Sequence, residues 1–121
     1  MANPKASMDK LMEIDGAVGC CLVDSSSGMM LAQSGGGAGL NLEVAAAANT
    51  EVVRAKRKAI KALDLKDSIE DILITLGRQY HLIRLLKSNE ALFFYLVLDK
   101  SRANLAMARH LLAEAEKEVS V

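Results

Sequence analysis

The side chains of this sequence that could do chemistry are two cysteines, two histidines and a run of three serines. Cys20 and Cys21 are adjacent in the apolar stretch AVGCCLVD (17–24), and the serines at 25–27 follow directly. Adjacent residues of a strand point to opposite faces of a sheet, so the two thiols are poorly placed to act on one substrate or to hold one metal ion. We therefore interpret both cysteines as structural thiols that fill space in a core.

The other candidates lack the spacing that chemistry requires. His81 and His110 are isolated, and neither a CxxC nor an HExxH pattern is present. The serines have no GxSxG elbow around them, and Asp24 stands where a strand meets its turn, which capping explains. The segment GGGAG (35–39) lacks the Gly-Lys-Ser/Thr ending of a phosphate loop, so we interpret it as a hinge. The sequence does not decide whether the fold brings a serine and a histidine together, but we expect no enzyme, no cofactor and no metal.

Length and composition indicate a single domain, residues 1–121, with an aliphatic core. The chain is 51% hydrophobic and only 3% aromatic, and 15 basic and 15 acidic residues give a net charge of zero. This balance provides no overall attraction for nucleic acid. The longest apolar run, ALFFYLVL (91–98), is shorter than the roughly 18 residues that a membrane span needs, and the N-terminus lacks an apolar signal core. We expect a cytoplasmic protein with reduced thiols and no membrane insertion.

Helical and strand patterns alternate along the chain. Short turns such as SSSG favour antiparallel pairing, and ALFFYLVL is apolar on both faces, which is typical of a central strand covered on both sides. We expect Ser7 to cap the first helix and Asn41 to cap the longest one. The predicted order is a helix (7–16), two strands (17–24 and 29–34), a helix (41–63), three strands (70–77, 79–87 and 91–98) and a helix (102–119).

The long helix at 41–63 has three distinct faces at 100° per residue. One apolar stripe, expected to lie close to the sheet of its own chain, consists of Ala45, Ala48, Val52, Ala55, Ala59 and Leu63. A second, mixed stripe, with the spacing of a helix-to-helix seam, consists of Asn49, Val53, Lys56 and Ile60. The opposite side is basic, with Arg54, Arg57, Lys58 and Lys61. A basic helical face is compatible with a plain solvated face, a protein-docking surface or, with so few aromatic residues, less readily a nucleic-acid surface.

At this point the sequence resembles the Roadblock/dynein light-chain domain family. The stretch IDGAVGCCLVDSSSGMMLAQS (14–34) is similar to the opening hairpin of these domains, and LVLDKSRANLAMARHLLAEA (96–115) is similar to their last strand and helix. The resemblance implies an α+β fold with a five-stranded antiparallel sheet. It places the long helix on one face and the N- and C-terminal helices on the other, in the order α-β-β-α-β-β-β-α.

The same resemblance implies a regulatory or scaffold role. Roadblock domains usually form dimers, and their bacterial members include MglB-type regulators of Ras-like GTPases. We therefore expect a non-catalytic homodimer, or a heterodimer with a paralogue, that docks a small Ras-like GTPase and modulates its nucleotide cycle. A small-ligand sensor domain and a plain dimerisation module are the alternatives, and a cysteine-dependent redox enzyme is a weaker third.

We assign one set of residues to the expected dimer and another to the expected GTPase contact. We expect the dimer to use the mixed stripe and the edge strand 70–76, whose unpaired backbone groups a second copy would satisfy. The expected dimer residues are Asn49, Val53, Lys56, Ile60, Ile72 and Ile74. The expected GTPase-docking residues are the four basic side chains Arg54, Arg57, Lys58 and Lys61, with Ala46 and Val53 as the nearest apolar anchors.

Overall fold

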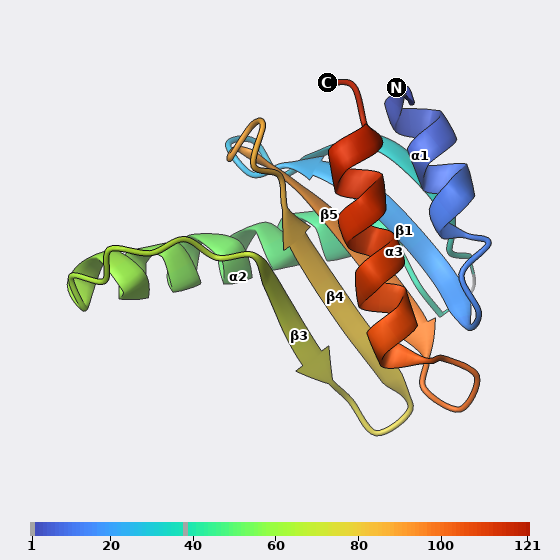
Figure 1. Cartoon of the computed structure of the whole chain (residues 1–121). Helices are drawn as coiled ribbons and strands as arrows, with labels where there is room; N and C mark the ends of the chain where they lie inside the picture. The colour runs from blue at the N-terminus through green and yellow to red at the C-terminus, as the bar shows by residue number, and fades with distance from the viewer. Residues whose placement is uncertain (1, 38) are drawn as a thin grey trace.

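Five antiparallel strands form one sheet, and three helices pack against its two faces (Figure 1). The computed structural model describes residues 2–37 and 39–121. The strands lie in the order β2-β1-β5-β4-β3, so the apolar strand β5 is central, as its sequence predicts. The elements are α1 (Pro4–Leu11), β1 (Ala17–Asp24), β2 (Met29–Gly35), α2 (Leu42–Ala62), β3 (Asp71–Thr75), β4 (Gln79–Leu85), β5 (Leu92–Asp99) and α3 (Leu105–Glu118). The predicted α+β order and the antiparallel pairing are confirmed.

Each helix begins at an asparagine whose side-chain oxygen accepts a backbone N–H of the first turn. The capping residues are Asn3, Asn41 and Asn104. The first cap differs from the expected Ser7, because Pro4 favours the first turn of a helix and the chain becomes helical at that point. Ser7 instead lies inside α1 and is buried.

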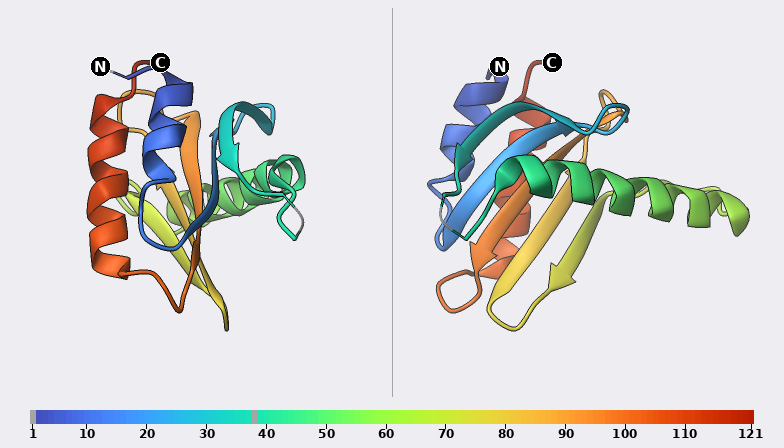
Figure 2. Two further views of the ribbon diagram at one scale, coloured as in Figure 1. Left: turned by 90° about the vertical axis from the view of Figure 1, so that its right-hand side faces the viewer. Right: turned by 180° about the vertical axis from the view of Figure 1, so that it is seen from behind.

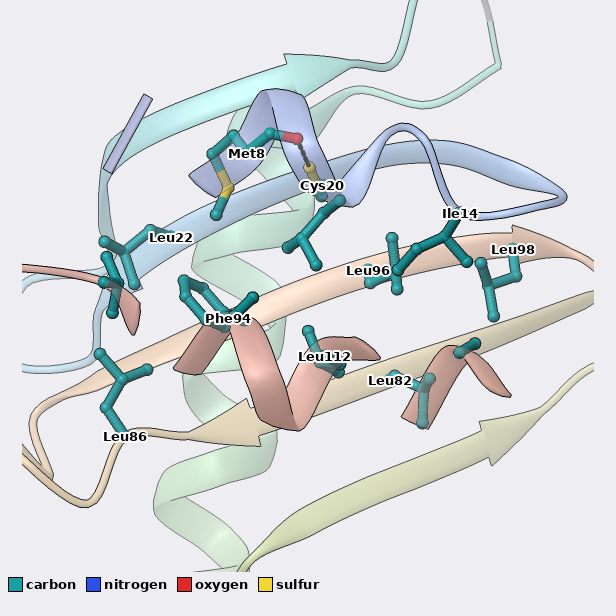
Figure 3. Packing of buried hydrophobic residues seen from close by; sticks show 14 of the residues in the cluster. Met8, Ile14, Cys20, Leu22, Leu82, Leu86, Phe94, Leu96, Leu98 and Leu112 are labelled. Atoms are coloured by element: carbon teal, nitrogen blue, oxygen red, sulfur yellow. Dashed lines mark hydrogen bonds between the residues drawn. The ribbon is translucent and has the colours of Figure 1, made fainter. Parts of the chain in front are cut away.

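The helices divide the apolar interior into two clusters, one on each face of the sheet. Helices α1 and α3 lie side by side on one face, and α2 lies on the other, as the two turned views show (Figure 2). Beneath α1 and α3, Phe94 and Leu96 of β5 pack with Cys20 and Met8 (Figure 3). Beneath α2, Cys21 packs with other side chains of the sheet. The adjacent cysteines thus point to opposite faces, as predicted.

Helix α2 presents a different stripe to the sheet than the sequence analysis expected. It buries Leu42, Ala46, Thr50 and Val53, whereas Val52 of the predicted sheet-facing stripe is 37% exposed. Each stripe contains one leucine and one valine, so apolar area alone does not choose between them, and contact with the sheet sets which side faces inward. The Thr50 hydroxyl donates to the Ala46 carbonyl at 2.7 Å, which satisfies it in the core.

Only the first half of α2 lies over its own sheet. The N-terminal turns pack on β1 and β2, and the C-terminal half projects past the edge strand β3 into solvent (Figures 1 and 2). The chain then runs back along this projecting half before it enters β3. No helix of the described residues combines the length and apolar character needed to span a bilayer.

Candidate interaction surfaces on the long helix and the open sheet edge

The two cysteines are inert within the fold. Both side chains are 0% exposed, and the Cys20 thiol donates to the Met8 carbonyl with a sulfur-to-oxygen distance of 3.3 Å. Burial raises the pKa of each thiol to about 12, so the nucleophilic thiolate is scarce at neutral pH. Within residues 2–37 and 39–121, no three His, Cys, Asp or Glu side chains come together as a metal site would require.

The serine run forms a turn. Asp24 Oδ1 accepts the Ser26 hydroxyl at 2.5 Å and the Ser26 backbone N–H at 2.9 Å, and these two hydrogen bonds lower the pKa of the Asp24 carboxyl. The Ser25 hydroxyl donates to the Ala91 carbonyl at 2.6 Å, which ties the β1–β2 turn to the β4–β5 turn. Asp24 thus caps its own turn, as predicted, and Ser25 joins that turn to the next one, which was not predicted.

His81 belongs to a short polar chain on the α2 side of the sheet. The Tyr95 hydroxyl and His81 Nδ1 are 3.0 Å apart, and His81 Nε2 lies 2.9 Å from Gln79 Oε1. Burial lowers the pKa of His81. The neutral ring fits both contacts, since Nδ1 accepts from Tyr95 and Nε2–H donates to Gln79.

The edge strand β3 is open and regular. The Leu76 N–H donates to the Gln79 carbonyl at 2.8 Å, so even-numbered residues of β3 bond to β4. The backbone groups of Asp71, Leu73 and Thr75 consequently point outward, because bonding alternates along an antiparallel pair. The β3–β4 register runs without a bulge, and no other strand of the described chain covers this edge.

The other edge strand, β2, is distorted and partly covered. Its pairing with β1 shifts register between Leu22 and Val23, and Lys5 Nζ donates to the Gln33 carbonyl at 3.1 Å. Bulges and lysines at an edge oppose pairing with another strand. Of the two edges, β3 therefore offers the better surface for a second strand.

An apolar stripe on α2 faces solvent, beginning on the half over the sheet and continuing along the half that projects beyond β3. Its members follow steps of four, three, four and four residues, the spacing of a seam between two helices. The stripe consists of Ala48, Val52, Ala55, Ala59 and Leu63. Leu63 is 66% exposed, and all the others except the half-buried Ala59 are exposed too. These are five of the six residues that the sequence analysis had assigned to the sheet; the sixth, Ala45, does pack against the core beneath α2.

The expected dimer residues of α2 occupy several environments. Val53 is 0% exposed because it packs on its own sheet, so its side chain is closed to a partner in this structure. Asn49 and Ile60 are half-buried, and Lys56 is exposed beside the seam stripe. On β3, Ile72 and Ile74 are half-buried on the α2 side of the sheet.

The residues expected to dock a GTPase also differ in how exposed they are. Ala46 is 1% exposed, so neither it nor Val53 can serve as an apolar anchor without a change in the helix. Arg54 donates to the Ser25 carbonyl at 2.8 Å, and Arg57 donates to the Glu90 carbonyl. These arginines join α2 to the two turns. Arg54 is still exposed, as the sequence analysis expected, whereas Arg57 is half-buried.

Lys58 and Lys61 remain exposed on this side of the helix. Beside the C-terminal part of α2 lies a hollow of about 360 Å³ whose apolar lining includes the buried Leu85 and Leu86. Its rim mixes cations such as Lys61 with carboxylates such as Glu90. The hollow therefore has no preference for a ligand of one charge.

A cluster of ion pairs joins β3 and β4 to α3, on the face of the sheet opposite α2. Arg84 of β4 lies between Glu116 and Asp71, with nitrogen-to-oxygen distances of 3.1 and 3.6 Å. Arg109 of α3 donates to both carboxylate oxygens of Asp71 at 3.0–3.1 Å. Arg84, Asp71 and Glu116 are all at most 12% exposed in their side chains, so the cluster ties α3 to the open edge strand. Sequence reasoning missed it because these residues are far apart in the chain.

Solved structures show the same arrangement of sheet and helices. MglB from Myxococcus xanthus matches with a TM-score of 0.83 at 17% identity, covering 94% of this chain and 89% of that one. A Roadblock/LC7 domain from Streptomyces avermitilis matches with a TM-score of 0.80 at 12% identity, covering 96% and 93%. The chain has the Roadblock/LC7 fold.

A third Roadblock-fold structure agrees with these two. The gliding protein MglB from Thermus thermophilus has a TM-score of 0.76 and 18% identity, with 92% of this chain and 81% of that one covered. No protein-family model matches the sequence, and no curated protein matches it. The fold expected from the resemblance, with the long helix on one face and the terminal helices on the other, is confirmed.

Proposed function

We propose that two copies of this chain pair through β3 and α2, and that the paired α2 helices dock a small Ras-like GTPase. The observation that carries the proposal is the seam stripe, an exposed apolar surface on a helix that projects past an unprotected strand edge. A projecting helix of this kind is stabilised when a second chain supplies the missing layer.

The strand contact has a simple symmetric solution. The outward-facing residues Asp71, Leu73 and Thr75 are symmetric about Leu73, so a two-fold axis there pairs each strand antiparallel with its copy. Such a contact is isologous and satisfies the outward backbone groups of both chains. The projecting half of each α2 would then cross the joint edge and lie over the sheet of the partner.

The helix contact follows from the same axis. Two α2 helices would run antiparallel, with their seam stripes facing each other. Alanines let helix backbones approach closely, and Val52 and Leu63 supply the larger apolar contacts. Lys56, beside the seam, can keep its ammonium in water while its stem packs on apolar surface.

The GTPase platform is the outer surface of this helix pair. Resemblance to MglB-type domains supports GTPase docking on the long helix, and Lys58 and Lys61 are the exposed cations that could register an acidic partner surface. Charges at an interface rim mainly affect the association rate and its salt dependence. Any effect on GTP hydrolysis would arise from reshaping the GTPase, because Arg54 and Arg57 are occupied by the turns of their own chain.

Pairing through β3 is tested by Leu73→Pro. The Leu73 N–H points outward, so proline at this position leaves the β3–β4 hydrogen bonds intact and blocks an added strand. We expect a folded monomer by light scattering and circular dichroism. Ile72→Pro is the matched control, since its N–H faces β4 and its loss should destabilise the fold. A Leu73→Pro protein that remains a dimer would show that β3 is not the interface.

Docking is tested separately with Lys58→Glu combined with Lys61→Glu. The double variant should stay a dimer and should bind a Ras-like GTPase of the same organism, loaded with a GTP analogue, more weakly and with less salt dependence. Glu43→Lys on the same helix is the control. If affinity and salt dependence do not change, the platform lies elsewhere.

A further inference from the structure

The face of the sheet opposite α2 carries a groove between α1 and α3. The groove has a volume of about 290 Å³ and is lined by Lys10, Leu11, Glu13, Ile14, Leu111, Glu114, Ala115 and Glu118. Its size lies near the lower end of ligand pockets, roughly 300–1,000 Å³. We call it the α1–α3 groove.

The floor of the groove is apolar and continues onto an exposed row of α3. Leu11 and Ile14 are at most 8% exposed and close the bottom, while Leu111 is 38% exposed at the side. One turn before Leu111, Met107 is 52% exposed. Residues four apart share a helix face, so Met107 and Leu111 extend the apolar surface out of the groove along α3.

One end of the groove is closed by contacts between the two termini. The Lys10 ammonium lies 3.1 Å from a carboxylate oxygen of Glu118, which joins α1 to α3. The Ala2 N–H also donates to the Glu118 carbonyl at 2.8 Å. A ligand therefore reaches the groove from the other end, past Met107 and Leu111.

The rim of the groove is acidic. Glu13 has no ion-pair partner within residues 2–37 and 39–121, and Glu114 has only Lys117, one turn away at 3.8 Å. Lys10, the single cation of the lining, is already paired with Glu118. Carboxylates from the turn after α1 (Glu13) and from α3 (Glu114) thus flank an apolar floor, and the rim holds more negative than positive charge.

We propose that the α1–α3 groove binds a cationic amphipathic helix of a partner protein. Apolar side chains of this helix would enter the groove over Leu11 and Leu111, and lysine or arginine side chains beside them would meet Glu13 and Glu114. This is recognition of a helix by its apolar face, with charge complementarity at the rim. Helices α1 and α3 lie on the face of the sheet away from α2 (Figure 2), so the groove between them is a second surface, independent of the proposed dimer and GTPase platform.

The test uses a synthetic helical peptide with leucines at positions i, i+3, i+4 and i+7 and lysines flanking them. A second peptide carries glutamates in place of the lysines. Each is titrated into the full chain while backbone amide shifts are followed by NMR. We expect the lysine peptide to shift amides of α1 and α3, and the glutamate peptide to bind at least about tenfold more weakly, since two rim charge contacts supply roughly that factor.

A charge swap on the protein makes the test specific. Glu13→Lys combined with Glu114→Lys should reverse the preference between the two peptides, and Leu111→Ser should weaken both. Glu43→Lys combined with Glu51→Lys makes the same charge change on α2 and should leave binding unchanged. Equal binding of the two peptides, shifts confined to residues outside 4–14 and α3, or no shifts at millimolar peptide would each overturn the proposal.

Discussion

The substitution Ala55→Glu tests the α2 seam at its middle. Ala55 is exposed in the single chain and is the central member of the seam stripe. Glutamate is a good helix former, and surface substitutions of this kind usually change the free energy of unfolding by less than about 0.5 kcal/mol. The variant should therefore fold normally, so that any effect on assembly comes from the interface.

The expected effect on the dimer follows from the geometry of two packed helices. Packed helix axes lie about 8–10 Å apart, which brings the two introduced carboxylates within about 8 Å of each other near the two-fold axis. At an effective dielectric constant of about 20, two like charges at that distance repel by about 2 kcal/mol. Since 1.4 kcal/mol is a factor of ten, the dissociation constant should rise at least about 30-fold.

Sedimentation equilibrium over a range of concentrations measures this constant directly. Raising the salt concentration should recover part of the affinity, because salt screens charges that water can reach. Ala106→Glu, an exposed alanine on α3, is the matched control and should leave the dissociation constant unchanged. An Ala55→Glu protein that dimerises as tightly as the parent would refute the seam.

Three further predictions concern the single chain. Arg57→Ala should lower the free energy of unfolding by about 1–2 kcal/mol in denaturant titrations, because it removes hydrogen bonds that join α2 to two turns. Cys20 and Cys21 should resist a thiol reagent at pH 8 in the native state and react on unfolding, since burial raises the pKa of both to about 12; fast native labelling would contradict this. Burial lowers the pKa of His81, so the unfolded chain binds its proton more readily. Stability should consequently fall as the pH drops below about 6.5, and His81→Gln should reduce that slope in thermal melts.

The sequence predicted the layout of the fold because its signals are local and strong. Turn residues, three helical periodicities and the two-sided apolar strand ALFFYLVL determine the order of the elements and the central place of β5. The register of α2 could not be obtained in this way. The stripe predicted to face the sheet and the stripe that does so both contain apolar residues that repeat with the period of a helix. Only contact with the sheet decides that Leu42 and Val53 face inward while Val52 faces solvent.

The candidate site was harder to predict for a related reason. Basic residues on one side of a helix indicate a charged face, but not what that face meets in space. Arg54 and Arg57 turn toward carbonyls of the β1–β2 and β4–β5 turns, about 30 residues away in sequence on either side. The exposed seam stripe was visible as a spacing of fours and threes, and was assigned to the wrong neighbour.

The difference between the two sheet edges limits how large an assembly can grow. Two chains joined through β3 would display a β2 strand at each outer end of the combined sheet. If β2 were as regular as β3, further copies could add at both ends, and an open-ended fibre would follow. The bulge in β2 at Leu31, opposite Leu22 and Val23 of β1, and the lysine on the Gln33 carbonyl would oppose that growth. If two chains pair through β3 as proposed, the second edge would therefore stop the joined sheet from growing beyond two copies.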